Sequence, residues 1–290
     1  RISADAPEEF LQQIAESALS GHNNFALIND DVLIPACVRA GKTLAEVRLY
    51  VNGGCQETIV EGVEHSAGAY YYFNLARSLD LCLRPADREP GQKEVPEAER
   101  HLPQPVTADG SFDDFYRDTL IRIRDLIRLG ADWVRTLGRR TWEIQPCPLY
   151  STNLADCIAN GKDYTAGGAR YNPSGICLVG FGTVVDSLAV IQRAVFEEGW
   201  LGLGELNRAL TANWEGYESL RARLITLPKF GHDDPLPNDL ARRLAADLGQ
   251  FVRHLENERG DAFQASLFVY YMFLRMGKQV RATPDGRGNA

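Results

Sequence analysis

The chain has 290 residues, of which 44% are hydrophobic and 24% charged, a balance typical of a soluble globular protein. Its 39 acidic and 31 basic residues give a net charge of −8, and the basic residues form no block. Since a nucleic-acid surface needs clustered Lys or Arg, no nucleic-acid partner is expected. The longest uncharged run, between Arg170 and Asp186, is interrupted by Gly and Pro, so no membrane segment is expected either.

The six cysteines indicate free thiols rather than a metal site or a disulfide framework. They are Cys37, Cys55, Cys82, Cys147, Cys157 and Cys177. No two of them form a C-x-x-C pair and no histidine stands at metal-ligand spacing, so the sequence predicts no bound metal. The start of the chain carries no cleavable signal pattern, which favours a cytoplasmic protein. The chain opens on Arg1 and stops after "TPDGRGNA", which predicts that both ends are cut.

The N-terminal part of the chain is expected to alternate short helices with a short strand. Asp5 is placed to cap a helix that runs to Gly21. The run "NFALIND", residues 24–30, predicts a strand that ends at a cap-like Asn-Asp pair. Helices are then expected over residues 31–41 and 43–50.

The middle of the chain predicts two longer helices separated by a surface excursion. Residues 66–83, "SAGAYYYFNLARSLDLCL", lack a breaker after Gly68 and predict a largely buried helix. Residues 84–110 are rich in proline and charge and predict a long surface excursion. Ser111 and two aspartates open an amphipathic helix. Its expected core face consists of Phe112, Phe115, Leu120, Ile123, Leu126 and Ile127.

The remaining segments alternate expected strands with helices, which indicates an α/β fold. Inner strands and turns are predicted over residues 148–153 and 167–183, and a strand or buried segment over 265–277. Helices are predicted over residues 184–199, 203–214 and 237–260, with Asp233–Pro235 forming a turn before the last helix. Length alone allows one large domain or two modest ones.

The stretch "YVNGGCQETIV", Tyr50 to Val60, is the candidate for chemistry. In extended backbone, residues i and i+2 point to the same side, so Cys55 and Glu57 would present a thiol and a carboxylate to one space. Gly53 and Gly54 allow a tight loop and a close backbone approach. The alternative is a cysteine acting as a small buried hydrophobe beside a solvated glutamate.

A set of segments in this order and spacing resembles the glycyl radical enzymes, the pyruvate formate-lyase-like superfamily. The segments are "FALINDDVLIPACVRAG", "GGCQE", "HSAGAYYYFNLARSLDL", "PLYSTN", "GGARYNPSGI", "GTVVDSLAVIQRAVFEE", "NWEGYESLRARL", "KFGHDDP" and "ATPDGR". The resemblance implies part of a ten-stranded α/β barrel, with helices outside and the catalytic cysteine on an inner loop. Residues 1–290 would then form a single partial catalytic domain.

The resemblance also implies the chemistry of the site. Cys55 matches the cysteine that becomes a thiyl radical, and Glu57 matches the general base of the C-x-E motif. The radical would start on a glycine outside this chain, installed by a radical S-adenosylmethionine activating enzyme. The substrate would be a small molecule and the full protein a homodimer. The chain lacks the family's N-terminal half and its R-V-x-G-Y segment, so by itself it is expected to be inactive.

Within the superfamily, the residues around Cys55 favour a dehydratase-like lyase. Gln56 follows Cys55 where the formate-lyase branch has a second cysteine, which disfavours acetyl transfer to coenzyme A. Ala69 stands where the glycerol dehydratase pattern has an acidic residue, which weakens assignment to diol substrates. Some arylacetate decarboxylases also carry C-x-E, so cleavage of a C–C bond stays open.

Four further residues are candidate substrate contacts. His65 could supply the titratable group that Ala69 does not, although a histidine at a helix start is the alternative. Tyr150, Arg170 and Tyr171 lie in segments that carry the resemblance. Two other functions stay open: a relic or binding protein without radical chemistry, and a thiol hydrolase in which His65 activates Cys55.

Overall fold

The structure, a computed structural model, describes residues 1–22, 25–53, 57–65, 67–84, 106–267 and 269–289. The chain divides into two compact units. The first unit contains residues 1–66 and 147–172, and the second contains residues 67–146 and 173–290.

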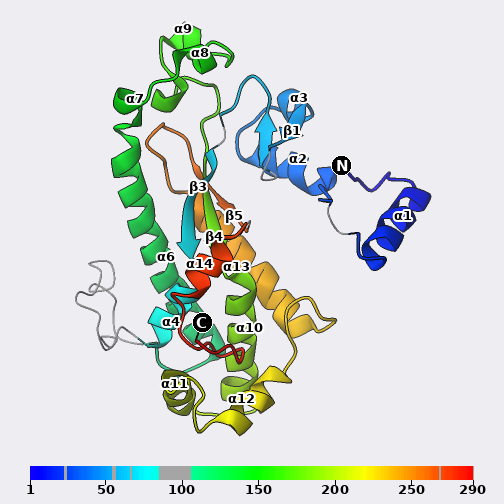
Figure 1. The fold of residues 1–290 in the computed structure, drawn as a ribbon, viewed down its shortest axis with the longest axis vertical. Coiled ribbons are helices and arrows are strands. Elements are labelled where there is room, and N and C mark those ends of the chain that lie inside the picture. The colour runs from blue at the N-terminus through cyan, green and yellow to red at the C-terminus, as the bar shows by residue number, and fades with distance from the viewer. Residues whose placement is uncertain (23–24, 54–56, 66, 85–105, 268, 290) are drawn as a thin grey trace. The chain divides into compact units, whose positions relative to one another are not determined.

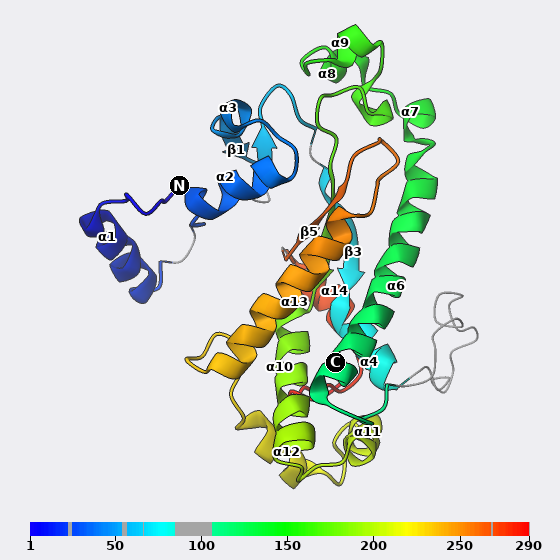
Figure 2. The ribbon, with the colours of Figure 1, turned by 180° about the vertical axis from the view of Figure 1, so that it is seen from behind.

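The second unit is built on a parallel sheet of three strands in the order β3-β4-β5. The strands are β3 (Ala67–Asn74), β4 (Ser174–Val179) and β5 (Phe263–Ser266). Every residue of β4 is buried, as expected for a central strand whose two faces are covered by helices. Figures 1 and 2 show α6 (Phe112–Gly138) against β3 and α13 (Pro235–Arg253) against β5. The prediction of an α/β fold is therefore confirmed.

The remaining helices of the second unit complete its core. They are α4 (Leu75–Leu83), α7 (Thr141–Ile144), α10 (Phe181–Ile191), the π-helical turn η2 (Gln192–Glu197), α11 (Leu203–Thr211), α12 (Glu218–Ile225) and α14 (Met272–Gly277). On α6, Phe115, Ile123 and Ile127 are fully buried, so the predicted core face of this helix is confirmed for these residues. The helix begins with a capping box between Ser111 and Asp114, the start that its sequence predicts.

The first unit consists of short elements. These are α1 (Glu8–Leu19), α2 (Asp30–Arg39), α3 (Leu44–Val47), β1 (Tyr50–Asn52), β2 (Thr58–Val60), α8 (Pro148–Ser151), α9 (Cys157–Asn160) and the 3₁₀ turn η1 (Tyr164–Ala166). Its apolar cluster is small, with Leu154, Cys157 and Ala169 buried and Tyr164 packed against them. Polar contacts therefore have a large share in holding this unit together.

The prediction of one helix over residues 66–83 is wrong. The segment forms β3 up to Asn74 and then α4. The side chain of Asn74 accepts a hydrogen bond from the backbone N–H of Arg77 and so caps α4. The aromatic run before the cap, Tyr70 to Phe73, is typical of a strand. Because large side chains continue through both elements, the sequence does not show where the two-residue period of the strand gives way to the helical period.

Four local predictions are also corrected. Asp5 does not cap α1, because Pro7 precedes its first residue and no side chain bonds there. Residues 25–29 form only an isolated bridge between Asn29 and Ile2, since the Asn29 side chain caps α2, which begins at Asp30. Residues 148–151 are helical rather than extended. The segment after β5 forms α14, which has no buried side chain.

Most of the predicted surface excursion, residues 85–105, lies outside the described residues. At its two ends Arg84 and Val106 are buried. The Val106 N–H donates to the carbonyl of Cys82 over 2.9 Å, which joins the return of the chain to α4.

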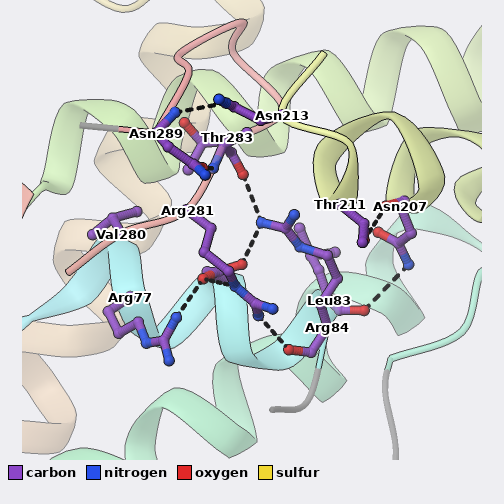
Figure 3. Close-up of polar contacts among 12 residues, drawn as sticks. Arg77, Leu83, Arg84, Asn207, Thr211, Asn213, Val280, Arg281, Thr283 and Asn289 are labelled. Atoms are coloured by element: carbon purple, nitrogen blue, oxygen red, sulfur yellow. Dashed lines mark hydrogen bonds and ion pairs between the residues drawn. The ribbon is translucent and has the colours of Figure 1, made fainter. Parts of the chain in front are cut away.

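A buried carboxylate on α4 holds the C-terminal segment of the second unit. Asp80 accepts hydrogen bonds from Arg77 and Arg281, each over 2.9 Å, and from Arg84. Arg84 also donates to the carbonyl of Ala282 over 2.6 Å, and Arg281 donates to the carbonyl of Arg84 over 2.7 Å. Figure 3 shows these arginines meeting between α4 and the C-terminal segment.

Replacing Asp80 by Asn is expected to lower the free energy of unfolding by about 3–5 kcal/mol, because it leaves the buried Arg84 and the half-buried Arg77 and Arg281 without their counter-charge. The control is Asp239→Asn, which removes an exposed carboxylate paired with Arg242 and should cost less than about 1 kcal/mol. Urea unfolding of both variants measures the difference, and equal losses would contradict the role given to Asp80.

The turn from β4 into α10 needs glycine at position 180. Gly180 has φ +90°, and a Cβ there would lie 2.8 Å from the Cβ of Ala76. Gly180→Ala is therefore expected to cost about 2–5 kcal/mol, from backbone strain and overpacking together. Gly231 has nearly the same backbone, φ +89°, with nothing within 4 Å of the added atom. Gly231→Ala should cost only about 1–2 kcal/mol in the same unfolding measurement, so similar losses would rule out the packing term.

Candidate active site

The stretch that carries Cys55 is the connection of a β-hairpin in the first unit. Strands β1 and β2 pair antiparallel, with Tyr50 opposite Val60 and Asn52 opposite Thr58. Beyond the last pair, the Gly53 N–H donates to the carbonyl of Glu57 over 2.7 Å. Residues 54–56, including Cys55, lie outside the described residues. The predicted common orientation of Cys55 and Glu57 therefore stays a prediction.

Gly53 lies directly beside the carboxylate of Glu57. A Cβ at position 53 would lie 2.9 Å from Glu57 Oε2 and 3.1 Å from Ile59 Cδ1. Glu57 itself is half-buried. An alanine at position 53 would require the flexible end of the Glu57 side chain to move, so the contact favours glycine without requiring it. The close backbone approach predicted for Gly53 and Gly54 stays a prediction.

Two anchors hold the far end of the hairpin. Tyr50 is buried, and its hydroxyl donates to Asp30 over 2.6 Å. Burial and this hydrogen bond raise the pKa of Tyr50 to about 12, so the phenol stays a donor. At the end of β2, Glu64 Oε2 accepts a hydrogen bond from the Val60 N–H over 2.8 Å. The Lys42 ammonium lies 2.7 Å from both oxygens of Glu64.

Backbone hydrogen bonds join the residues just after the hairpin to the segment that contains Arg170 and Tyr171. The Tyr171 N–H donates to Val63, and the His65 N–H donates to Tyr171, each over 3.1 Å. The Tyr171 hydroxyl donates to Glu46 over 2.7 Å. Arg170 is ion-paired with both Glu46 and Asp156. A substrate contact by Arg170 or Tyr171 would therefore require them to leave these partners.

His65 and Tyr150, predicted separately, are brought together in the first unit. The His65 ring lies 4.1 Å from the ring centre of Tyr164 and 5.8 Å from that of Tyr150. Burial and a hydrogen bond with Cys147 raise the pKa of Tyr164. Tyr150 is about half exposed, so this aromatic cluster has an open side.

Sequence reasoning missed Lys42, Glu46, Glu64 and Tyr164. Lys42 and Glu64 are 22 residues apart, and Glu46 and Tyr171 are 125 apart, so no local spacing connects them. Tyr164 precedes the "GGARYN" segment, but a lone tyrosine is more often a core residue. The one available signal was the position of Lys42 and Glu64 on either side of the hairpin.

Three further findings concern the described residues alone. They contain no group of three or more His, Cys, Asp or Glu side chains placed to bind a metal ion. None of their helices combines the length and the apolar character needed to cross a membrane. The five described cysteines are thiols rather than disulfides.

Glu46 gives the first unit a testable pH dependence. Hydrogen bonds from Thr43, Tyr171 and Arg170 lower its pKa to about 2, against an ordinary value of 4.5. Because the folded pKa lies below the unfolded one, ionised Glu46 stabilises the fold above about pH 4.5, and this stabilisation is lost as the pH falls toward 2.

The melting temperature of the parent should therefore exceed that of Glu46→Gln at pH 6, and the difference should shrink between pH 4.5 and pH 2. The difference should correspond to about 1 kcal/mol, because Glu46 is near the surface and solvent screens its partners. A difference that stays constant down to pH 2 would contradict the proposed cause.

The second unit has a parallel sheet covered by helices, and in the first unit the sequence between β1 and β2 contains Cys55 and Glu57. The chain is therefore an α/β protein with a candidate thiol–carboxylate site. The chain belongs to the pyruvate formate lyase-like family, whose model matches residues 1–273. The resemblance to glycyl radical enzymes is thereby confirmed.

Individual relatives agree with this assignment. The chain is 30% identical over 292 residues to trans-4-hydroxy-L-proline dehydratase of Clostridioides difficile, covering 99% of this chain and 36% of the relative. The glycerol-bound B12-independent glycerol dehydratase from Clostridium butyricum superposes with a TM-score of 0.86 at 31% identity, over 100% of this chain and 36% of that one. A glycyl radical enzyme from Archaeoglobus fulgidus has a TM-score of 0.83 at 27% identity, over 100% of this chain and 36% of that one. The chain thus spans about a third of the length of the relatives it matches.

Proposed function

We propose that this chain is the catalytic-cysteine part of a glycyl radical lyase that eliminates a group next to a hydroxyl-bearing carbon of a small substrate. The observation that carries the proposal is the hairpin with C-x-E between its strands, inside a family match over residues 1–273. Two consecutive Cα–Cα steps keep the Cα atoms of Cys55 and Glu57 within about 7.6 Å. The thiol and the carboxylate can therefore reach neighbouring atoms of one small molecule.

The proposed reaction is redox-neutral. The sulfur of Cys55, as a thiyl radical, takes a hydrogen atom from the substrate carbon, so an S–H bond forms and a C–H bond breaks. Glu57 accepts the proton of the hydroxyl on that carbon, and the group on the next carbon leaves with its bonding electron pair. The product radical then takes the hydrogen atom back from Cys55, which restores the sulfur radical.

The proposed cofactor is a glycyl radical, which would supply the unpaired electron to Cys55. The described ends of the connection support such a role, because the Gly53 N–H donates to the carbonyl of Glu57 over 2.7 Å and so closes the hairpin beside the Glu57 carboxylate. A radical S-adenosylmethionine enzyme is the proposed activating partner. Both units would belong to one catalytic barrel, of the ten-stranded type, in a cytoplasmic homodimer. Enclosure of this kind protects a radical from water and oxygen.

The substrate is proposed to be a small hydroxylated molecule. Support comes from the names of the relatives, which act on hydroxyproline and glycerol. The cluster of His65, Tyr150 and Tyr164 offers a polar and aromatic surface with an open side, which suits a substrate contact. The alanine at position 69 favours a substrate other than a simple diol.

The test uses the protein as its gene encodes it, activated anaerobically. Cys55→Ala should abolish turnover because it removes the atom that takes the hydrogen. Glu57→Gln should lower kcat by about 10²–10⁴-fold, the usual contribution of a positioned general base. Substrate loss and product formation per glycyl radical, counted by electron paramagnetic resonance, give the measurement.

Cys37→Ala is the matched control, since Cys37 is a half-buried thiol in the same unit, and it should keep parental turnover. Full activity of Cys55→Ala would end the proposal. Loss of activity in Cys55→Ala with full activity in Glu57→Gln would replace elimination by a reaction such as decarboxylation.

A further inference from the structure

We infer that Lys42 and Glu64 are positioning residues for the reaction, a buried pair that fixes the hairpin whose end carries Cys55 and Glu57. Neither side chain is catalytic in this inference, because both act through the backbone of β2. The inference rests on the proposed function and adds to it the device that sets the position of the reacting groups.

The pair is buried, and the Lys42 ammonium contacts both oxygens of the Glu64 carboxylate. The side chains of Lys42 and Glu64 are 4% and 0% exposed, and both carboxylate oxygens lie 2.7 Å from the ammonium. A buried ion pair is stable only while both charges are present, because the loss of either partner leaves the other charge uncompensated in the interior. The position of Glu64 is therefore determined by Lys42.

Glu64 transmits this position to the hairpin through two contacts. Its Oε2 accepts the Val60 N–H over 2.8 Å, and its own N–H donates to the Val60 carbonyl over 3.1 Å. Val60 pairs with Tyr50, and β2 then runs back to Glu57, which Gly53 holds by a backbone bond. A shift of Glu64 would therefore move Val60 through both contacts, and Val60 is joined to Glu57 by the three residues of β2.

The same pair is tied to the segment after Gly167. Glu64 bridges to Tyr171 through the backbone, and the Lys42 ammonium lies 6.0 Å from the centre of the Tyr171 ring. Tyr171 is held in turn by Glu46. The hairpin thus rests on two further segments of the first unit, residues 42–46 and the segment at Tyr171, as well as on its own two strands.

This support matters because misplacement of reacting groups by about 1 Å can cost about a hundredfold in rate. A structural role alone would affect folding but leave each folded, radical-bearing molecule fully active. A positioning role would lower kcat per radical while KM and the radical content stay the same. The two roles therefore differ in a measurable way.

The experiment compares Glu64→Gln with the double variant Lys42→Met/Glu64→Gln in the protein as its gene encodes it. Glu64→Gln should lower the melting temperature, since it strands the Lys42 charge in the interior. The double variant removes both charges, so its melting temperature should recover toward that of the parent. Its kcat per glycyl radical should nevertheless stay about 10- to 100-fold below the parent, with KM unchanged.

The matched control is Glu61→Gln, an exposed carboxylate three residues before Glu64, which should behave as the parent. Hydrogen exchange of the Val60 amide gives a readout independent of activity and should be faster in both Glu64 variants. A folded double variant with parental kcat per radical and parental Val60 exchange would overturn the inference. If neither variant folds, Lys42→Arg, which keeps the charge but changes its reach, is judged by the same two measurements.

Cys55→Ala, measured alongside, separates this inference from the proposed function. Activity of Cys55→Ala equal to the parent would refute the proposed function. The Val60 exchange and the rate of Cys55 alkylation by iodoacetamide would still show whether the pair holds the hairpin. Parental values of both in the double variant would refute the positioning role by itself.

Discussion

A carboxylate removed from water must be matched by cations, and two such groups hold the hairpin of the first unit and the C-terminal segment of the second. Glu64 in the first unit and Asp80 in the second each have a side chain with no exposed surface. Each isolated buried ion would cost several kcal/mol, so partners from distant parts of the chain are required. Lys42 compensates Glu64 at the hairpin, and three arginines compensate Asp80 beside the C-terminal segment.

The two units use this constraint differently because their cores differ in size. In the second unit, a parallel sheet and its helices bury a large apolar cluster, and the Asp80 network adds attachment of the C-terminal segment. In the first unit, the apolar cluster is small, so hydrogen bonds and ion pairs determine where the hairpin lies. Polar groups specify position more sharply than apolar contacts do, since their geometry is directional. A site that depends on position is therefore well placed in this unit.

The sequence predicts elements with one clear period and fails where the period changes within a buried run. Helix α6 alternates apolar and charged residues over its whole length and has its own capping box, so its core face was predictable. Large apolar and aromatic side chains continue from β3 into α4, and Asn74, which caps α4, marks the boundary between them. At the site, Cys55 and Glu57 are readable because they are neighbours in sequence. Lys42 and Glu64 are not, since their contact depends on the folded path between them.

The charges around the hairpin show what kind of chemistry this support suits. Arg170 is paired with Glu46 and Asp156, Lys42 with Glu64, and Asp30 with Arg1. Transfer of a hydrogen atom moves no net charge, so a nearby unpaired charge would add little to it, whereas the distance between sulfur and carbon would decide its rate. In the proposed elimination, only the removal of the hydroxyl proton calls for a charged group, and Glu57 at the end of the hairpin is the proposed base. Paired charges that fix the hairpin, together with this one carboxylate, fit the proposed reaction.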